Sequence, residues 1–322
     1  MTKSLLENPF TKVTTRVLSQ NEGDSHQALT ITHAHCTAVV SLYGGHVLSF
    51  TPTGHKDIFW LSEQASYQKG KAIRGGIPLC WPWFGPYKRP ELQSMATPPL
   101  DAEEKSKVNI TETEPLLSAS VNHGFARQLP WTVTDVSADE QGVTLVLTLV
   151  GENQHPLWPN AYQLTQTLFF GKNFEQTLAM SNHSKEDTHY SAALHSYFSV
   201  SNPENITIPA LTGVEYDDKV TGKSNVQQQS VSCVGEIDRV YHSSDKMSLI
   251  DSQWQRRIDI VSTHCQQWVL WNPGTELANS MADVHDHGEQ EYVCLEAANT
   301  QWQTLPAGKT VTISQTIKVS QL

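Results

Sequence analysis

The sequence lacks the patterns that mark several common classes of protein. Its five cysteines are scattered and include no CxxC pair, so neither a disulfide framework nor a structural zinc site is indicated, and reduced thiols are expected. Neither a glycine-rich phosphate loop nor a GxSxG nucleophile turn is present. Met1 to Thr15 hold no apolar signal-peptide core, and no apolar run approaches a membrane span. These absences favour a cytoplasmic protein.

Basic residues are fewer than acidic residues. Lys and Arg number 22 and Asp and Glu number 33, which gives a net charge of −11. Such a charge repels nucleic acid and anionic membranes, so neither is an expected partner. An anionic small ligand would need a local basic site that overrides this field.

Long amphipathic helices and fixed-period repeats are also absent. Instead, β-branched and aromatic residues recur with period two, and Gly, Pro and Asn interrupt them at short intervals. Residues 1–25 are polar and are expected to lead into the first strand. The expected strands are 28–32, 37–42, 47–51, 131–136, 143–150, 162–170, 174–181, 191–200, 205–208, 257–262, 267–271, 292–296 and 310–319. The pattern predicts an antiparallel all-β protein with two or more packed sheets.

Two unusual segments interrupt this pattern. Residues 87–121 are rich in Pro, Ser, Thr and charge, so we expect a long surface loop, disordered in part or acting as a lid. Residues 73–86, IRGGIPLCWPWFGP, are apolar but irregular and carry one charge, Arg74. Such a segment must satisfy its backbone polar groups locally. It forms either the wall of a pocket or a packed loop over a sheet edge.

Two ionisable residues lie within apolar expected strands. His195 would share a strand face with Ala193 and Tyr197, as in the lining of a cleft, although a satisfied core histidine is the commoner case. Glu296 lies in YVCLEAAN, and Glu is seldom buried without a partner. Burial would raise the pKa of Glu296 and make it a better base near neutral pH. The alternative is a glutamate that faces solvent at a sheet edge.

Further charged residues are candidates for ligand binding. His123 and Arg127 follow the polar loop in HGFAR. Arg74 and Arg127 together could hold a phosphate or carboxylate, because guanidinium groups bind such groups bidentately, although each alone is more often a surface ion-pair residue. Asp238 could accept hydrogen bonds from sugar hydroxyls, but pairing with Arg239 is its default interpretation.

Two pairs of histidines raise the question of a metal site. His33 and His35 would share a strand face, but no third ligand is evident nearby. His285 and His287 lie in DVHDHGEQE, which is interpreted as an exposed acidic loop. No metal site is therefore predicted.

Six motifs, in this order, resemble those of the glucose-6-phosphate 1-epimerases, which are the hexose-6-phosphate mutarotases of the aldose 1-epimerase superfamily. The resemblance extends from about residue 30 to residue 319. The motifs are IRGGIPLCWPWFGP (73–86), HGFAR (123–127), LHSYF (194–198), DRVY (238–241), WNPG (271–274) and VCLE (293–296).

The resemblance implies a galactose-mutarotase-like β-supersandwich in a single domain spanning residues 1–322, with 87–121 as an insertion. It implies a monomer that interconverts the α and β anomers of a hexose 6-phosphate without metal or organic cofactor. His195 would be the general acid and Glu296 the general base.

The same resemblance assigns the substrate contacts. Arg74, Arg127 and Asp238 would hold the substrate, and His123 would lie beside the sugar. The family often has Gln before this His-Gly pair, whereas Asn122 stands here. The shorter amide of Asn122 could lose or lengthen one substrate contact.

Two other functions stay open. The first is a mutarotase of the same fold that acts on non-phosphorylated aldoses. The second is a sugar-phosphate binding or sensing protein without turnover. The presence of both His195 and Glu296 argues against the second, because loss of catalysis would free either residue to change.

Overall fold

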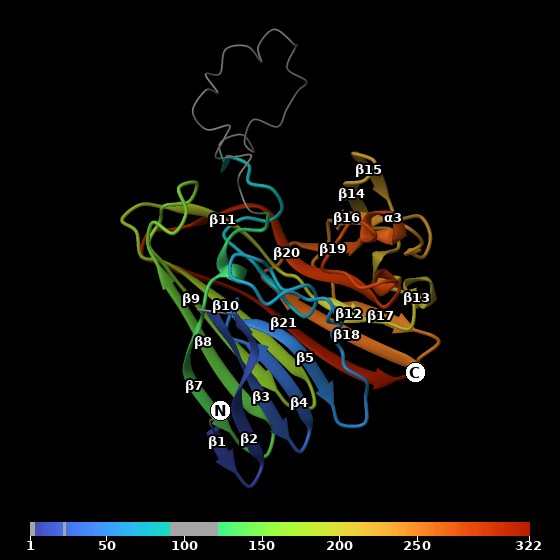
Figure 1. The fold of residues 1–322 in the computed structure, drawn as a ribbon. Helices are drawn as coiled ribbons and strands as arrows, with labels where there is room; N and C mark the ends of the chain where they lie inside the picture. Colours follow the sequence, from blue (N-terminus) through green and yellow to red (C-terminus); the bar gives the residue numbers. More distant parts are fainter. Residues whose placement is uncertain (1–3, 22–23, 91–121) are drawn as a thin grey trace, which may run out of the picture.

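Antiparallel strands dominate the computed structural model, which describes residues 4–21, 24–90 and 122–322 of the chain (Figure 1). Within these residues, no helix is long and apolar enough to cross a membrane. The helical segments are short: α3 (Gly274–Ala278) and the 3₁₀ turns η2 (Ala126–Gln128), η3 (Pro203–Asn205), η4 (Pro209–Leu211) and η5 (Gly288–Gln290).

The strands form three sheets. The first sheet has the order β1 (Ser4–Asn8), β2 (Thr11–Asn21), β3 (Asp24–His33), β4 (Cys36–Ser41) and β5 (His46–Pro52). The second has the order β13 (Ile206–Thr207), β17 (Met247–Asp251), β18 (Arg256–Thr263), β21 (Thr310–Gln321), β10 (Phe174–Asn182), β9 (Tyr162–Phe170), β8 (Val143–Gly151) and β7 (Thr132–Ala138). The third has the order β15 (Lys223–Val226), β14 (Glu215–Asp218), β16 (Ile237–Tyr241), β19 (Gln267–Asn272), β20 (Tyr292–Leu305), β11 (Thr188–Leu194) and β6 (Leu79–Cys80), with β12 (Tyr197–Ser199) also paired to β20.

The second sheet packs against both of the others. The ring of Phe174 on β10 lies 5.6 Å from that of Phe50 on β5 and 5.6 Å from that of Phe59. Phe59 in turn lies 5.9 Å from Phe198 on β12 of the third sheet. Each such buried aromatic ring contributes about 1.5–3 kcal/mol of hydrophobic stabilisation. One apolar core therefore joins all three sheets, and Figure 1 shows β3 to β5 crossing in front of β8 to β10.

The all-β prediction is confirmed, but four features of the strand pattern differ from expectation. Residues 1–25 include β1 and β2, because β2 pairs along β3 and buries Val13 although its other face is exposed. The four strands β14 to β17 were not expected, since each is only four or five residues long. β20 continues beyond residue 296 to Leu305. Of the expected loop 87–121, residues 91–121 lie outside the described part of the chain.

The fourth difference concerns the expected strand 191–200, which is interrupted. β11 ends at Leu194 and β12 begins at Tyr197, yet both keep one register with β20: Leu194 lies opposite Ala297 and Tyr197 lies opposite Cys294. Counting along this register places His195 directly opposite position 296. Side chains that lie opposite each other on one face of an antiparallel pair are close enough to touch.

A glycine in the segment before β6 provides a test of how tightly the sheets are joined. Gly76 has a φ of 62°, and an added Cβ atom would lie 2.1 Å from the carbonyl oxygen of Val47. Gly308 has a φ of 65° but has no atom within 4 Å of such a Cβ atom. We expect Gly308→Ala to lower the free energy of unfolding by roughly 1–2 kcal/mol through backbone strain alone. Gly76→Ala should cost about 2 kcal/mol more, because the backbone must also move.

Urea unfolding of the two variants beside the unmodified protein measures this difference. Equal losses for Gly76→Ala and Gly308→Ala would show that the close approach of Gly76 to β5 is not a constraint.

Candidate active site

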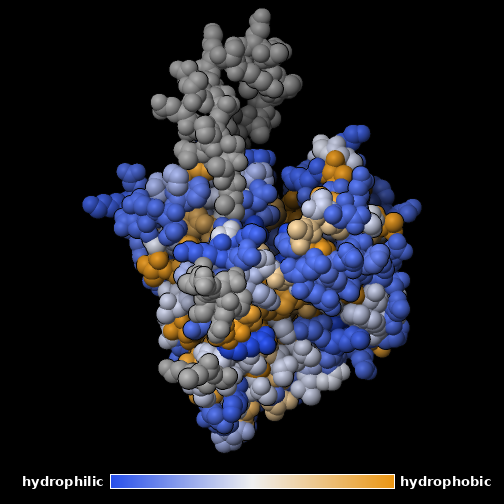
Figure 2. Space-filling model, viewed as in Figure 1, coloured by the Kyte–Doolittle hydropathy of each residue, from blue (hydrophilic) through white to orange (hydrophobic). Residues whose placement is uncertain are grey.

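One face of the third sheet points away from the core and carries most of the candidate residues. On β20, Leu295 faces the core, whereas Glu296 lies in register with Val269 of β19 on the opposite face. Figure 2 shows the molecular outline notched beside the lobe of β14 and β15, and β20 runs below this notch in Figure 1. Small apolar side chains line this face, namely those of Cys80, Ala193, Val240, Val269 and Ala298.

His195 and Glu296 touch on this face. His195 Nε2 lies 3.3 Å from Glu296 Oε1, and the two residues are 6 % and 1 % exposed. The imidazole stacks on the ring of Tyr197 with a centroid distance of 4.8 Å and an angle of 8°. His195 Nδ1 and Glu296 Oε2 are buried and have no hydrogen-bond partner among the residues that the structure describes. Each member of the pair therefore has one polar atom, Nδ1 of His195 or Oε2 of Glu296, available to bind a ligand.

The surroundings push both groups toward their uncharged forms. Burial lowers the pKa of His195 well below its ordinary value, and electrostatic interactions with His123 and with the charged Arg127 and Arg74 lower it further. Burial raises the pKa of Glu296 well above its ordinary value; the Asp238 carboxylate adds to this rise and Arg127 opposes it. A buried pair of ionisable groups in contact is best described as sharing one proton, which can sit on either group.

Arg74 reaches the same site through Tyr197. Its Nη1 donates to the Tyr197 hydroxyl oxygen at 2.9 Å, and its Nε donates to Asp283 Oδ2 at 3.1 Å. Because Tyr197 also stacks on His195, a single tyrosine side chain separates the guanidinium group from the imidazole. The guanidinium group of Arg74 at the site is therefore already paired with the carboxylate of Asp283.

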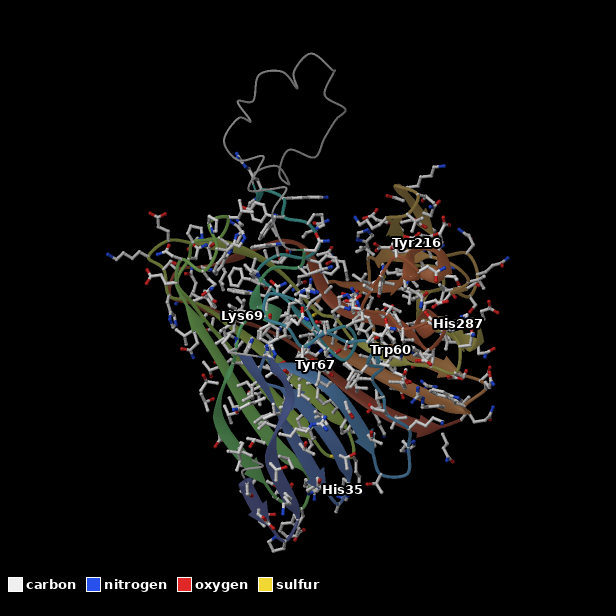
Figure 3. All side chains as sticks on the ribbon, in the orientation of Figure 1. His35, Trp60, Tyr67, Lys69, Tyr216 and His287 are labelled. Carbon is white, nitrogen blue, oxygen red and sulfur yellow. The ribbon has the colours of Figure 1, made fainter. Side chains whose placement is uncertain are left out.

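The prediction that residues 283–291, DVHDHGEQE, are merely an exposed acidic loop is wrong in part. The ring of His285 stacks on Trp60 at 5.6 Å, and its Nε2 lies 3.1 Å from Glu291 Oε2. Trp60 stacks in turn on Tyr292 at 4.2 Å. Figure 3 shows Trp60 and His287 on the same side of the molecule, beside the third sheet. This segment, which includes Asp283, therefore packs along the site.

Arg127 and His123 approach from the segment around η2. Arg127 Nη2 donates to the carbonyl oxygen of Asn122 at 2.7 Å, whereas its buried Nε has no partner. Burial lowers the pKa of Arg127, and the charge of Arg74 adds to the effect. The ring of His123 lies 5.7 Å from that of His195. Burial, followed by the charges of Arg127 and Arg74, holds the pKa of His123 well below its ordinary value, so this imidazole is neutral.

Asp238 lies on the same face of the sheet as Glu296. It is opposite Trp271 on β19, and Trp271 is opposite Cys294 on β20, two positions from Glu296. Burial raises the pKa of Asp238.

The default interpretation of Asp238 as the ion-pair partner of Arg239 is wrong. Arg239 Nε donates to Asp218 Oδ2 at 3.2 Å. Successive residues of a strand point to opposite faces, so Asp238 and Arg239 lie on opposite sides of the sheet.

The structure thus brings together His195, Glu296, Arg74, Arg127, His123 and Asp238, whereas Asn122 reaches the group through its backbone carbonyl. Sequence reasoning missed Asp283, the partner of Arg74, and Tyr292, whose buried hydroxyl has no partner. The signal for Tyr292 was present, because it lies two and four positions before Cys294 and Glu296 and so shares their strand face.

The other polar clusters in the described part of the chain do not form an alternative active site. Within the described residues, no three His, Cys, Asp or Glu side chains converge as metal ligands would. His33 ends β3, its Nε2 lies 3.0 Å from the Asp139 carbonyl oxygen, and its Nδ1 accepts from the backbone of His35. Figure 3 places His35 at the lower end of the molecule, far from Trp60. A surface cavity of about 690 Å³ between residues 242–245 and 264–266 contains no comparable acid–base pair.

The buried carboxyl group has a consequence for stability that depends on pH. Because folding raises the pKa of Glu296, the unfolded chain releases this proton at a lower pH than the folded chain does. The folded state therefore loses stability as the pH rises above the ordinary glutamate pKa, and Glu296→Gln removes this loss. We expect Glu296→Gln to unfold at a higher temperature than the unmodified protein at pH 8, with a gain that shrinks toward pH 4.

Thermal unfolding across this pH range, with Glu175→Gln as an exposed control on β10, measures the effect. A gain that is independent of pH, or equal in both variants, would contradict the assigned shift.

Comparison with known proteins identifies the family of this chain. The model of the aldose 1-epimerase family matches residues 27–94 and 106–318. Two curated relatives named "putative glucose-6-phosphate 1-epimerase", from Escherichia coli and Salmonella typhimurium, are 31 % and 32 % identical over the full length of both chains. The crystal structure of a "putative mutarotase (YeaD)" from Salmonella typhimurium superposes with a TM-score of 0.80 at 29 % identity, covering 98 % of this chain and 95 % of that one. The chain belongs to the aldose 1-epimerase family.

Proposed function

We propose that this protein interconverts the α and β anomers of a hexose 6-phosphate, with His195 and Glu296 as the acid and base. The observation that carries the assignment is the 3.3 Å contact between two buried ionisable groups whose pKa values are shifted in opposite directions. Groups tuned in this way are typical of general acid–base sites. The names of the curated relatives support a phosphorylated sugar as the substrate.

The reaction needs two proton transfers at adjacent oxygen atoms. Moving the shared proton from Glu296 to His195 creates a carboxylate base and an imidazolium acid. The carboxylate takes the proton of the anomeric hydroxyl while the imidazolium delivers its proton to the ring oxygen, and the C1–O5 bond breaks to give the open-chain aldehyde. Rotation about C1–C2 exposes the other carbonyl face, and the reverse transfers close the ring. Each proton-transfer group typically contributes on the order of 10²–10⁴-fold in rate.

The two arginines supply positive charge in an otherwise acidic protein. Arg127 has no carboxylate within 4.0 Å among the described residues, and its buried Nε is an unused donor. Arg74 is held by Tyr197 and Asp283 with its guanidinium facing the site. Both charges act on His195 and on His123, so they flank one site. A phosphate between them would orient the sugar without taking part in bond breaking.

The remaining candidates fit roles around the sugar. Neutral His123 lies beside His195 and can exchange hydrogen bonds with a sugar hydroxyl, as can Asp238 on the far side of Glu296. The exposed side chain of Asn122 is a candidate for a further contact. All of these residues come from one chain, and we propose that the reaction takes place in a cytoplasmic monomer without a protein partner, metal or organic cofactor.

Removing either member of the pair should stop the chemistry. We expect His195→Ala and Glu296→Gln to lower the rate of anomer exchange by about 10²-fold or more, because each variant loses one proton transfer. Exchange NMR with glucose 6-phosphate measures the rate, and circular dichroism reports whether the fold is kept. Folded variants that exchange at the unmodified rate would exclude the assigned roles.

Removing a phosphate-binding charge should discriminate between substrates. We expect Arg74→Ala to lower kcat/KM for glucose 6-phosphate about 10–100-fold more than for glucose, because a charge-assisted contact to phosphate contributes roughly 1.5–3 kcal/mol. Arg257→Ala is a matched control, since Arg257 also pairs with an aspartate but lies on β18 of the second sheet.

The same assay separates this function from its alternatives. Equal losses for both sugars in Arg74→Ala, or no preference for the phosphate in the unmodified protein, would favour a mutarotase of free aldoses. Binding of glucose 6-phosphate without exchange would indicate a sensing protein.

A further inference from the structure

A chain of buried polar side chains crosses the core and ends one residue from His195. Gln166 on β9, Gln176 on β10 and Gln315 on β21 are 0 %, 0 % and 1 % exposed, and Ser196 is 0 % exposed. The neighbouring inward positions on these strands hold Leu, Phe and Ile, so each glutamine replaces an apolar residue in the pattern. Amides are buried at a cost unless their donors and acceptors are paired.

The hydrogen bonds between the glutamines run in one direction, toward Gly45, whereas Gln315 and Ser196 exchange hydrogen bonds, with Ser196 Oγ also donating to Gln315 Oε1 at 3.3 Å. Gln166 Nε2 donates to the carbonyl oxygen of Gly45 at 2.6 Å, and Gln176 Nε2 donates to Gln166 Oε1 at 2.7 Å. Gln315 Nε2 donates both to Gln176 Oε1 at 2.7 Å and to Ser196 Oγ at 3.0 Å. Because a backbone carbonyl can only accept, Gly45 fixes the orientation of Gln166, and each amide then fixes the next. The position of the Ser196 hydroxyl is therefore set from the far side of the core.

Ser196 is also tied to both members of the acid–base pair through the main chain. It follows His195, whose backbone N–H donates to the Pro78 carbonyl oxygen at 3.2 Å. The carbonyl oxygen of Ser196 accepts from the N–H of Leu295 at 3.1 Å, and Leu295 precedes Glu296. At this point β11 has ended and β12 has not begun. The Ser196 side chain thus anchors the interrupted segment on its core side.

We propose that Gln315, acting through the Ser196 hydroxyl, is a positioning residue for the contact between His195 and Glu296. The proposal rests on the acid–base role proposed above for these two residues. A displacement of about 1 Å in a reacting group can lower a rate on the order of 10²-fold. Neither Gln315 nor Ser196 hydrogen-bonds to Arg74 or Arg127. Substitution of Gln315 or Ser196 should therefore slow the chemical step without weakening phosphate binding.

The test compares Gln315→Met and Ser196→Ala with a control that removes another buried amide. Asn182 is also fully buried on β10, but its Nδ2 donates to the carbonyl oxygens of Glu186 and Leu305 and has no link to Ser196. Asn182→Leu should lower thermal stability and leave kcat unchanged. The measurements are kcat and KM for glucose 6-phosphate, and the pKa of His195 by NMR of ¹⁵N-labelled histidine.

We expect Gln315→Met and Ser196→Ala each to lower kcat by about 10–100-fold, with KM changed by less than about twofold. The pKa of His195 should move in both variants and not in Asn182→Leu. The double variant should be no slower than the slower single variant, because both changes remove one connection. Ser196→Thr, which keeps the hydroxyl, should restore most of the activity.

The outcomes separate this proposal from the proposed function. If His195→Ala keeps anomer exchange, both are overturned. If His195→Ala abolishes exchange while Ser196→Ala keeps the unmodified kcat and the unmodified His195 pKa, only the positioning role is overturned. Ser196→Ala decides the question if Gln315→Met does not fold, because the alanine leaves no new bulk in the core.

Discussion

The site depends on one contact, that between a buried imidazole and a buried carboxyl group. Either group alone would be costly in an apolar sheet, because its charged form loses its hydration. Together they retain one proton between them and avoid two separate charges. The same burial that shifts both pKa values also leaves Nδ1 of His195 and Oε2 of Glu296 without partners among the described residues, so in the proposed acid–base role desolvation would supply both the reactivity and the vacant hydrogen-bonding positions.

The sheet provides this contact through register and alternation. His195 and Glu296 lie opposite each other on neighbouring strands, and each is followed or preceded by a core residue that holds the strand in place. Charges around the pair act in balance: Asp238 disfavours the ionised form of Glu296, and Arg127 favours it. Two layers of the molecule therefore have separate tasks. The face of the third sheet carries the polar groups, and the second sheet beneath it holds the buried amides that we propose fix their spacing.

Much of this arrangement follows from the sequence, and the remainder has identifiable physical reasons. Period-two patterns predict most of the long strands, with β2 as the exception, and the shared face of His195 and Tyr197, because alternation needs only neighbouring residues. Strands β14 to β17 escape prediction because short strands carry little periodicity. The partner of Arg74 escapes because Asp283 is distant in sequence and lies in a segment of acidic residues that suggests a solvated loop. The buried glutamines at 166, 176 and 315 were a visible irregularity in apolar strands, but their connection to Ser196 exists only once three strands have paired.

The wide sequence separation of the strands that meet at the site has a consequence for folding kinetics. In the third sheet β6 pairs with β11, and β11 and β12 pair with β20, across long stretches of sequence, since Cys80 lies opposite Ala193 and Ala193 lies opposite Ala298. These contacts therefore close long loops of chain. Contacts of this kind form late and slowly, because loop-closure entropy is lost before they contribute any stabilisation. Enzymatic turnover therefore reports completion of the topology as a whole. During refolding, enzymatic activity should return only when the strands most distant in sequence have paired. Tryptophan fluorescence should change earlier, when the chain collapses.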